Sequence, residues 1–347
     1  MKSVPLNVVC VRCKSKNLYR FGKDAAGFQK FQCKDCKRQF APDNPNTWTT
    51  GKRKHPDCPQ CGKASFLHHD YTYYSNYRCA DKSCNHSFFH PKDVEIKAPS
   101  SALPAEAFSM KRMRHPMYLI LAALNYYFLS DASTRQVKHL MSTIHQVSIS
   151  HVTISKWVKR FAPVFQTIAD HLTNKMNFAN SDEWHFDETY VSIGGVDYYL
   201  WVAIDSETRF VLDYHLSVYR DSESAYRLLN SCQEKFGQPS SAVVSDRYAA
   251  YREPAKQFFP DVDHIQVESF KDLISNNLIE AFFGQYKDWY KAKRGFASYT
   301  SANQLIATYI FCHNFLKPHS SLEQHTPAEV AGFTAKKRSK DNWLLVA

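Results

Sequence analysis

Hydrophobic and polar residues follow the period of β-strands in the middle of the chain, from residue 184 onward. Three runs rich in aromatic and β-branched residues are separated by a Gly-Gly pair or by polar turns, as expected of strands joined by tight connections. They cover residues 184–193, 197–206 and 210–220. We predict that the three strands form an antiparallel meander.

Helices and strands alternate after this meander. The pattern predicts a helix over residues 222–236, a strand over 242–246, a helix near Ala249, a strand over 264–270, and two longer helices over about 276–294 and 301–316. A three-stranded meander followed by alternating helices and strands is the element order of an RNase H-like fold of the α/β class.

A helical region is predicted ahead of the strands. Residues 116–129 form an apolar run in which Pro116 takes a first-turn position. Ser133 and Ser150 are suited to cap two further short helices, whose apolar residues recur at helical spacing. These residues are Val137, Leu140 and Met141 in the first helix, and Ile154, Trp157, Val158 and Phe161 in the second. Two short helices joined by a tight connection make a helix-turn-helix candidate.

Polar side chains of the second helix of this pair are predicted to face outward, where they could reach DNA bases and phosphates. The set is His151, Thr153, Ser155, Lys156, Lys159 and Arg160. We take Lys156, Lys159 and Arg160 as candidate DNA contacts. An ordinary helical hairpin inside a helical domain is the alternative.

Eight of the ten cysteines lie in two similar groups near the N-terminus. The first group is CxxC, 19 residues and CxxC, and the second is CxxC, 17 residues and CxxxxC; the members are Cys10, Cys13, Cys33 and Cys36, then Cys58, Cys61, Cys79 and Cys84. Two thiolate knuckles joined by a hairpin supply the four ligands of a tetrahedral structural Zn²⁺ site. We therefore predict two zinc ribbons whose folding depends on the metal. The alternative is eight buried or redox-active cysteines, and the repeated spacing favours zinc.

The second group is less regular, so a histidine could replace one of its cysteines. The candidates are His68, His69, His86 and His90.

Positive charge is concentrated in the same N-terminal part of the chain. The formal net charge is +11, and residues 1–114 alone hold 21 Lys and Arg against 9 Asp and Glu. Basic residues interleave with the cysteines, and a basic run follows at Lys52, Arg53 and Lys54. Such residues neutralise phosphates, so we predict double-stranded DNA as the partner. A protein partner for the ribbons, or a role of the charge in solubility alone, is the alternative.

The sequence indicates no secretion signal, because charge and cysteine interrupt the first apolar residues. The longest apolar run, residues 116–129, is shorter than the roughly 20 residues that span a bilayer. We therefore expect a cytoplasmic, nucleoid-associated protein with reduced cysteines and no membrane partner.

Three acidic residues fall where an RNase H-like fold could bring them together. Asp187 interrupts an otherwise apolar strand, where an unpaired carboxylate is costly. Asp246 ends the strand over 242–246, the end at which open α/β sheets place ligands. Glu280 lies on the next long helix, with Lys287 two turns onward on the same face. Each acid alone is more often a solvated or capping residue, but three convergent carboxylates suit a pair of divalent cations.

These segments resemble the DDE motif of insertion-sequence transposases, whose core is RNase H-like. The resemblance is carried by DET at 187–189, SDRYAAY at 245–251, and NNLIE at 276–280 followed by Lys287. The stretch HNFLKPHSSLEQHTPAEVAG at 313–332 resembles the ending of those transposases and of retroviral-type integrases. The match covers residues 184–332, and the front end is also similar to that of some prokaryotic insertion-sequence members.

The resemblance implies that Asp187, Asp246 and Glu280 bind Mg²⁺ or Mn²⁺ and that Lys287 contacts DNA. The helix that carries Glu280 is unusually aromatic, and we interpret this as core packing rather than a base-stacking platform. Its aromatic residues are Phe282, Phe283, Tyr286, Trp289 and Tyr290.

We therefore interpret the chain as a DNA transposase with an RNase H-like catalytic core preceded by two small zinc ribbons and a helix-turn-helix region. The predicted domains are a first ribbon over 1–48, a second over 49–95, the helix-turn-helix region over 108–175 and the DDE domain over 181–335, with a polar linker near 91–107. Water would cleave at the ends of the element to free a 3′-hydroxyl, which would then attack target DNA in line. Because two ends must be paired, we expect at least a homodimer on DNA.

Three other functions fit parts of this pattern. They are a non-catalytic DNA-binding regulator derived from a transposase, a zinc-ribbon adaptor that binds proteins, and a nuclease of the same fold that does not join ends.

Overall fold

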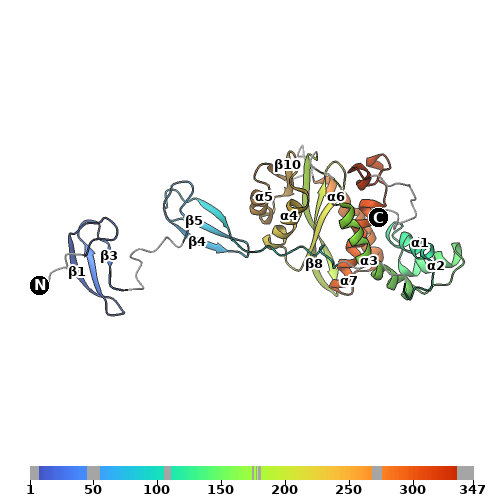
Figure 1. Ribbon diagram of the computed structural model, residues 1–347, viewed down its shortest axis with the longest axis horizontal. Coiled ribbons are helices and arrows are strands. Elements are labelled where there is room, and N and C mark those ends of the chain that lie inside the picture. Colours follow the sequence, from blue (N-terminus) through green and yellow to red (C-terminus); the bar gives the residue numbers. More distant parts are fainter. Residues whose placement is uncertain are drawn as a thin grey trace. The chain divides into compact units, whose positions relative to one another are not determined.

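The computed structural model describes residues 8–44, 55–104, 111–173, 176, 178, 181–267 and 276–333. By their contacts the residues divide into two compact units (Figure 1). The smaller unit comprises Met1–Asp70 and Tyr74–His90, and the larger comprises Tyr71–Tyr73 and Pro91–Ala347. Several predicted features lie outside the described residues: the basic run Lys52, Arg53 and Lys54, positions 268–270 of the last predicted strand, and the predicted domain limits at 48, 49, 108, 175 and 335.

The smaller unit is built on two three-stranded sheets. They consist of β1 (Leu18–Lys23), β2 (Gln29–Cys33) and β3 (Gln39–Phe40), and of β4 (Ser65–Asp70), β5 (Tyr74–Cys79) and β6 (Ser87–Pro91). The first sheet buries Leu18, Phe31 and Phe40 with two cysteines. A core of this size contributes little stability, so a ribbon of this kind depends on a further cross-link such as a metal.

The larger unit contains one five-stranded sheet of order β11-β10-β7-β8-β9. Its strands are β7 (Glu183–Ile193), β8 (Val196–Asp205), β9 (Val211–Ser217), β10 (Ala242–Asp246) and β11 (Asp263–Val267). Strands β7, β8 and β9 are antiparallel, whereas β10 runs parallel to β7 and to β11. Gly194 and Gly195 both have positive φ, as a two-residue hairpin turn between β7 and β8 requires. The predicted meander and the RNase H-like fold are thereby confirmed.

Helices cover both faces of this sheet (Figure 1). On one face lie α4 (Ser222–Phe236), the short 3₁₀ helix η1 (Ala249–Tyr251) and α5 (Arg252–Phe258). On the other lie α6 (Asn277–Lys293) and α7 (Tyr299–Phe315), and η2 (Ser320–Leu322) and α8 (Pro327–Val330) follow in the chain. Side chains two residues apart on a strand point to the same face of the sheet. Trp184 and Phe186 of β7 are such a pair, and both contact Phe259, which follows α5.

The third strand is shorter than predicted. Residues 218–220 form a loop instead, because Asp221 begins a new element by capping α4: its side chain accepts the Ser224 amide. This correction matters for the site, since it moves Arg220 from a strand into the loop that precedes α4.

Three further helices belong to the larger unit: α1 (Met117–Phe128), α2 (Thr134–Ile144) and α3 (His151–Thr173). Ser133 caps α2 through a capping box with Gln136, as its position predicted. The apolar residues predicted from helical spacing, among them Val137, Met141 and Trp157, share one core with the sheet.

Helix α3 is longer than the short helix predicted from Ser150, and it continues through Pro163. The residues beyond the proline are held by burial: Phe165 stacks on Phe311 of α7, with ring centroids 5.0 Å apart. Proline in a helix interior costs about 3 kcal/mol, and this shared core offsets the cost.

The aromatic face of α6 is packed as predicted. Phe282, Phe283, Tyr286 and Trp289 are buried, and Trp289 stacks on Phe128 of α1 at 5.9 Å between ring centroids. Packing at the far end of α6 therefore positions its first turn, where Glu280 lies. Among the described helices, none combines the length and apolarity needed to cross a membrane.

Candidate active site

Asp187 and Asp246 lie on neighbouring strands. In the parallel pairing of β7 and β10, Ser245 is opposite Phe186, so Asp246 follows one residue later beside Asp187. Carboxylate oxygens of Asp187, Glu188 and Asp246 all lie within 4.8 Å of one another. The structure therefore brings together two of the predicted acids, and it adds Glu188, which the sequence analysis did not select.

Glu280 on helix α6 is not part of this close group of Asp187, Glu188 and Asp246, but its negative charge acts on Asp187. The pKa of Asp187 is raised to about 7, first by burial and then by the negative charge of surrounding carboxylates, of which Glu280 is one. Glu280 itself is exposed in the first turn of α6, and Lys287 is exposed about two turns further on. An acid whose ionisation is opposed by its neighbours is characteristic of sites that bind cations.

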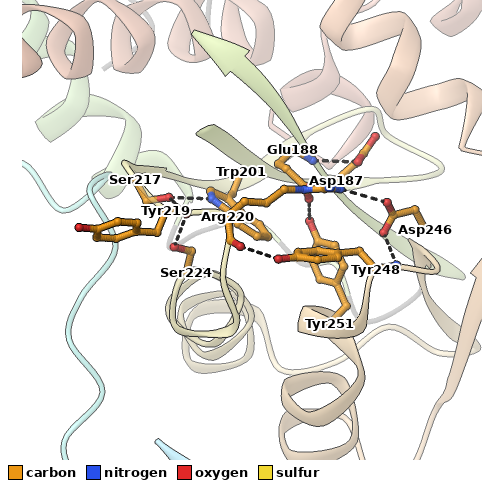
Figure 2. Close-up of polar contacts among 10 residues, drawn as sticks. All are labelled: Asp187, Glu188, Trp201, Ser217, Tyr219, Arg220, Ser224, Asp246, Tyr248 and Tyr251. Carbon is orange, nitrogen blue, oxygen red and sulfur yellow. Dashed lines mark hydrogen bonds and ion pairs between the residues drawn. The ribbon is translucent and has the colours of Figure 1, made fainter. Parts of the chain in front are cut away.

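Glu188 is held by two partners on the α4 and η1 side of the sheet (Figure 2). One oxygen accepts from Nε of Arg220, and the other accepts from the hydroxyl of Tyr251. Burial raises the pKa of Glu188, while these two partners oppose that shift. The sequence signal for Glu188 was its place beside Asp187, and Tyr251 ends the SDRYAAY segment at 245–251. Arg220, 32 residues from Glu188, carried no signal.

Asp246 is fixed at both carboxylate oxygens. Oδ1 accepts the backbone N–H of Tyr248 at 2.9 Å, and Oδ2 lies 3.5 Å from Nη2 of Arg220. The site thus offers convergent carboxylate oxygens whose positions are set by the surrounding protein. Hard divalent cations such as Mg²⁺ and Mn²⁺ take ligands of this kind, so the donor set fits the predicted cation.

The cysteines form two separate clusters of four, Cys10, Cys13, Cys33 and Cys36, and Cys58, Cys61, Cys79 and Cys84. The shortest sulfur–sulfur distances are 3.5 to 3.8 Å. Four thiolates placed about 2.3 Å from a tetrahedral Zn²⁺ would lie about 3.8 Å apart. Both clusters therefore have the geometry of a structural zinc site.

The histidines considered for the second cluster make other contacts. His86 stacks on Phe88, His90 lies against Tyr77, and His68 and His69 contact each other. The four cysteines of the second cluster thus supply four zinc ligands without a histidine.

The candidate DNA contacts of α3 lie on its surface. Lys156, Lys159 and Arg160 are exposed, and Arg160 donates to the backbone oxygen of Lys111. His151 is also exposed, whereas Thr153 and Ser155 are half-buried.

Comparison with known proteins bears on both ends of the chain. Residues 181–319 match the model of a DDE domain family named for IS240, and residues 1–37 match the InsA N-terminal domain, a zinc ribbon. The chain is therefore similar to DDE domains over residues 181–319. This matched segment contains all three predicted acids.

Curated proteins similar to this chain include transposases. The chain is 31% identical over 126 residues to the transposase of the insertion sequence-like element IS431mec of Staphylococcus aureus, which covers 36% of this chain and 54% of that protein. It is 43% identical over 35 residues to the InsA protein of insertion element iso-IS1N of Shigella dysenteriae, covering 10% of this chain and 39% of that one. The chain therefore spans about half the length of the transposase relatives that it matches.

Solved structures similar to the DDE domain include two integrase cores. The HTLV-2 integrase catalytic core domain has a TM-score of 0.35 and 15% identity, covering 45% of this chain and 99% of that one. The catalytic core domain of BIV integrase has a TM-score of 0.34 and 15% identity, covering 44% and 94%.

Proposed function

We propose that the chain is an insertion-sequence transposase that binds the ends of its element and catalyses metal-dependent DNA cleavage and strand transfer. The observation that supports the proposal is the meeting of Asp187 and Asp246 on neighbouring strands of a segment that matches a DDE domain. The negative charge of Glu280, on helix α6 of the same segment, also acts on Asp187. The transposases among its relatives support the same function.

Asp187, Asp246 and Glu280 are the residues that would hold Mg²⁺ or Mn²⁺. Such cations supply activation of the attacking oxygen and stabilisation of the leaving oxygen of a phosphodiester. The chain's own part is to keep the three carboxylates in place: β7 and β10 fix two of them, and the buried aromatic face of α6 fixes the third.

DNA would be held by three other parts of the chain. These are the two zinc-loaded ribbons, the exposed Lys156, Lys159 and Arg160 on α3, and Lys287 on α6. Cleavage at paired ends implies at least a homodimer on double-stranded DNA, and a DNA substrate places the protein in the cytoplasm at the nucleoid.

Alanine substitutions of the three acids test this proposal. With a duplex that carries the inverted repeat read from DNA flanking the coding sequence, and with Mg²⁺ or Mn²⁺ present, we expect D187A, D246A and E280A each to lower cleavage and strand transfer by about 10³-fold or more. DNA affinity should stay close to that of the wild type, because none of the three supplies a positive charge.

The matched control is D197A, since Asp197 is an exposed residue of β8 that pairs with Ser192, five residues along β7 from Asp187. D197A should cleave like the wild type. Cleavage retained in the triple alanine variant would end the proposal.

A further inference from the structure

Arg220 occupies the loop between β9 and α4, beside the candidate metal site (Figure 2). Three contacts fix it. Its Nε donates to Glu188, its guanidinium carbon lies 4.1 Å from the ring centre of Tyr248, and its backbone oxygen accepts from the Tyr248 hydroxyl. The guanidinium is therefore held from one edge and one face.

Glu188 is suited to be the anchor of this arginine rather than a ligand of the cation. Its side chain is only 3% exposed, and both oxygens are already taken, one by Arg220 and one by Tyr251. A buried carboxylate requires such partners. Tyr251 is itself buried, so its hydroxyl keeps Glu188 in one orientation.

The terminal nitrogens of Arg220 remain for another ligand. The guanidinium has five N–H donors, and the described residues use one of them for Glu188 and bring one terminal nitrogen, Nη2, to 3.5 Å from Asp246. The side chains of Arg220 and Asp246 are each 38% exposed. The positively charged guanidinium of Arg220 is thus fixed, partly exposed and next to the cluster of acids.

A cation in this place suits an anionic ligand that lies against the carboxylates. A phosphodiester drawn to a divalent cation at Asp187 and Asp246 would be such a ligand, and the fork of an arginine matches two phosphate oxygens. The alternative role, holding Asp246 in place, is served already by the backbone N–H of Tyr248.

We propose that Arg220 binds the phosphate of the DNA strand that enters the metal site, and that Glu188, Tyr248 and Tyr251 position it for this contact. The inference rests on the proposed transposase function. It adds a substrate-binding residue from outside the three acids of the DDE motif.

A double-mutant cycle between protein and DNA tests the contact. The binding constant of the inverted-repeat duplex is measured in Ca²⁺ for the wild type and R220A, with a normal phosphate or a neutral methylphosphonate at the bond to be cleaved. Each single change should weaken binding by about 10-fold, the worth of one charge-assisted contact. The two changes together should weaken it no further than either one alone.

Cleavage rates and metal affinity complete the test. We expect kcat/KM to fall by about 10- to 100-fold in R220A and by less in R220K, which keeps the charge but loses the fork. Mn²⁺ affinity, measured by titration calorimetry, should not weaken in R220A. If R220A does not fold, the double variant E188Q/R220M replaces it, because this variant removes both charges of the buried pair. Its DNA affinity and cleavage rate are then compared with those of E188Q.

The control variant is R227A. Arg227 lies on α4 and pairs with Glu223 four residues earlier, so it matches Arg220 in type and in having an acidic partner. Its DNA binding and cleavage should equal those of the wild type.

Two results would overturn the inference. One is a loss of DNA affinity for the two changes together that equals the product of the two single losses, which would mean that Arg220 does not contact the phosphate. The other is weaker Mn²⁺ binding in R220A, which would make Arg220 a positioning residue for Asp246. Failure of the transposase proposal would look different, since the wild type and D187A would then be equally inactive on the same duplex.

Discussion

Asn314 shows how one buried polar side chain completes the fold. It lies on α7 with 3% of its surface exposed, and it bonds both backbone groups of Val211 at the start of β9. Its amide oxygen accepts the Val211 N–H at 2.9 Å, and its amide nitrogen donates to the Val211 oxygen at 2.9 Å. Because β9 is the last strand of the sheet, Asn314 stands in for the strand that would otherwise pair there.

Replacing Asn314 by leucine should destabilise the larger unit. The substitution keeps an apolar side chain of similar size but leaves two buried backbone groups unpaired, at a cost of about 1–3 kcal/mol each. Urea unfolding followed by tryptophan fluorescence measures the loss. N230L is the control, because the side chain of Asn230 donates to Glu234 in an exposed contact on α4. Equal losses in the two variants would contradict this account.

Helix α6 is anchored at the end opposite Glu280. Its last residue, Lys293, donates to the backbone oxygens of Tyr127 and Ala132 at 2.9 and 2.8 Å, and its ammonium lies 4.0 Å from the ring centre of Tyr127. Together with the stacking of Trp289 on Phe128, these contacts tie α6 to the end of α1. The element that carries Glu280 thus shares a core with helices α1, α2 and α3.

Lys293 should give the protein a particular dependence on pH. Burial lowers the pKa of Lys293 from 10.5 to about 7. Between these two values the folded chain binds fewer protons at this position than the unfolded chain, so the contribution of Lys293 to stability rises with pH. The free energy of unfolding of the wild type should therefore increase relative to that of K293M between pH 7 and pH 9.5.

Denaturant unfolding of both proteins at the two pH values checks this expectation. Other titrating groups are the same in the two chains and cancel in the difference. Parallel pH profiles would show that Lys293 titrates as a solvated lysine.

The sequence predicted the elements better than the contacts between them. Strand β10 and helix α4 have the predicted bounds, because the periodicity of apolar residues is a local signal. The length of α3 was missed, because only packing against α7 carries it past Pro163. The link from Glu188 to Arg220 was missed for the same reason, since it joins residues that meet only in the folded sheet.

At the scale of the whole molecule, the two units are stabilised in different ways. The larger unit has one extended core that runs through its sheet and helices. The first ribbon buries three large side chains beside its cysteines. We infer that metal binding and folding are linked in the smaller unit only.

Chelation of zinc should therefore unfold one part of the chain. With excess 1,10-phenanthroline we expect residues 8–44 and 55–90 to become sensitive to protease, while the thermal unfolding of the larger unit stays unchanged. The variant C10S/C13S should have the same effect on the first ribbon. The control is C232A, because Cys232 is buried in the larger unit and belongs to neither cysteine cluster. Protection of the ribbons after chelation would refute the link.

Two of the three acids lie on paired strands of the sheet, and the third lies on a helix. Asp187 and Asp246 move together, since their strands are bonded side by side, whereas Glu280 moves with a helix fastened to α1. The two distances from Glu280 to this pair can therefore change without breaking the sheet. A shift of α1 would therefore move Glu280 relative to the two aspartates, because α6 is bonded to the end of α1.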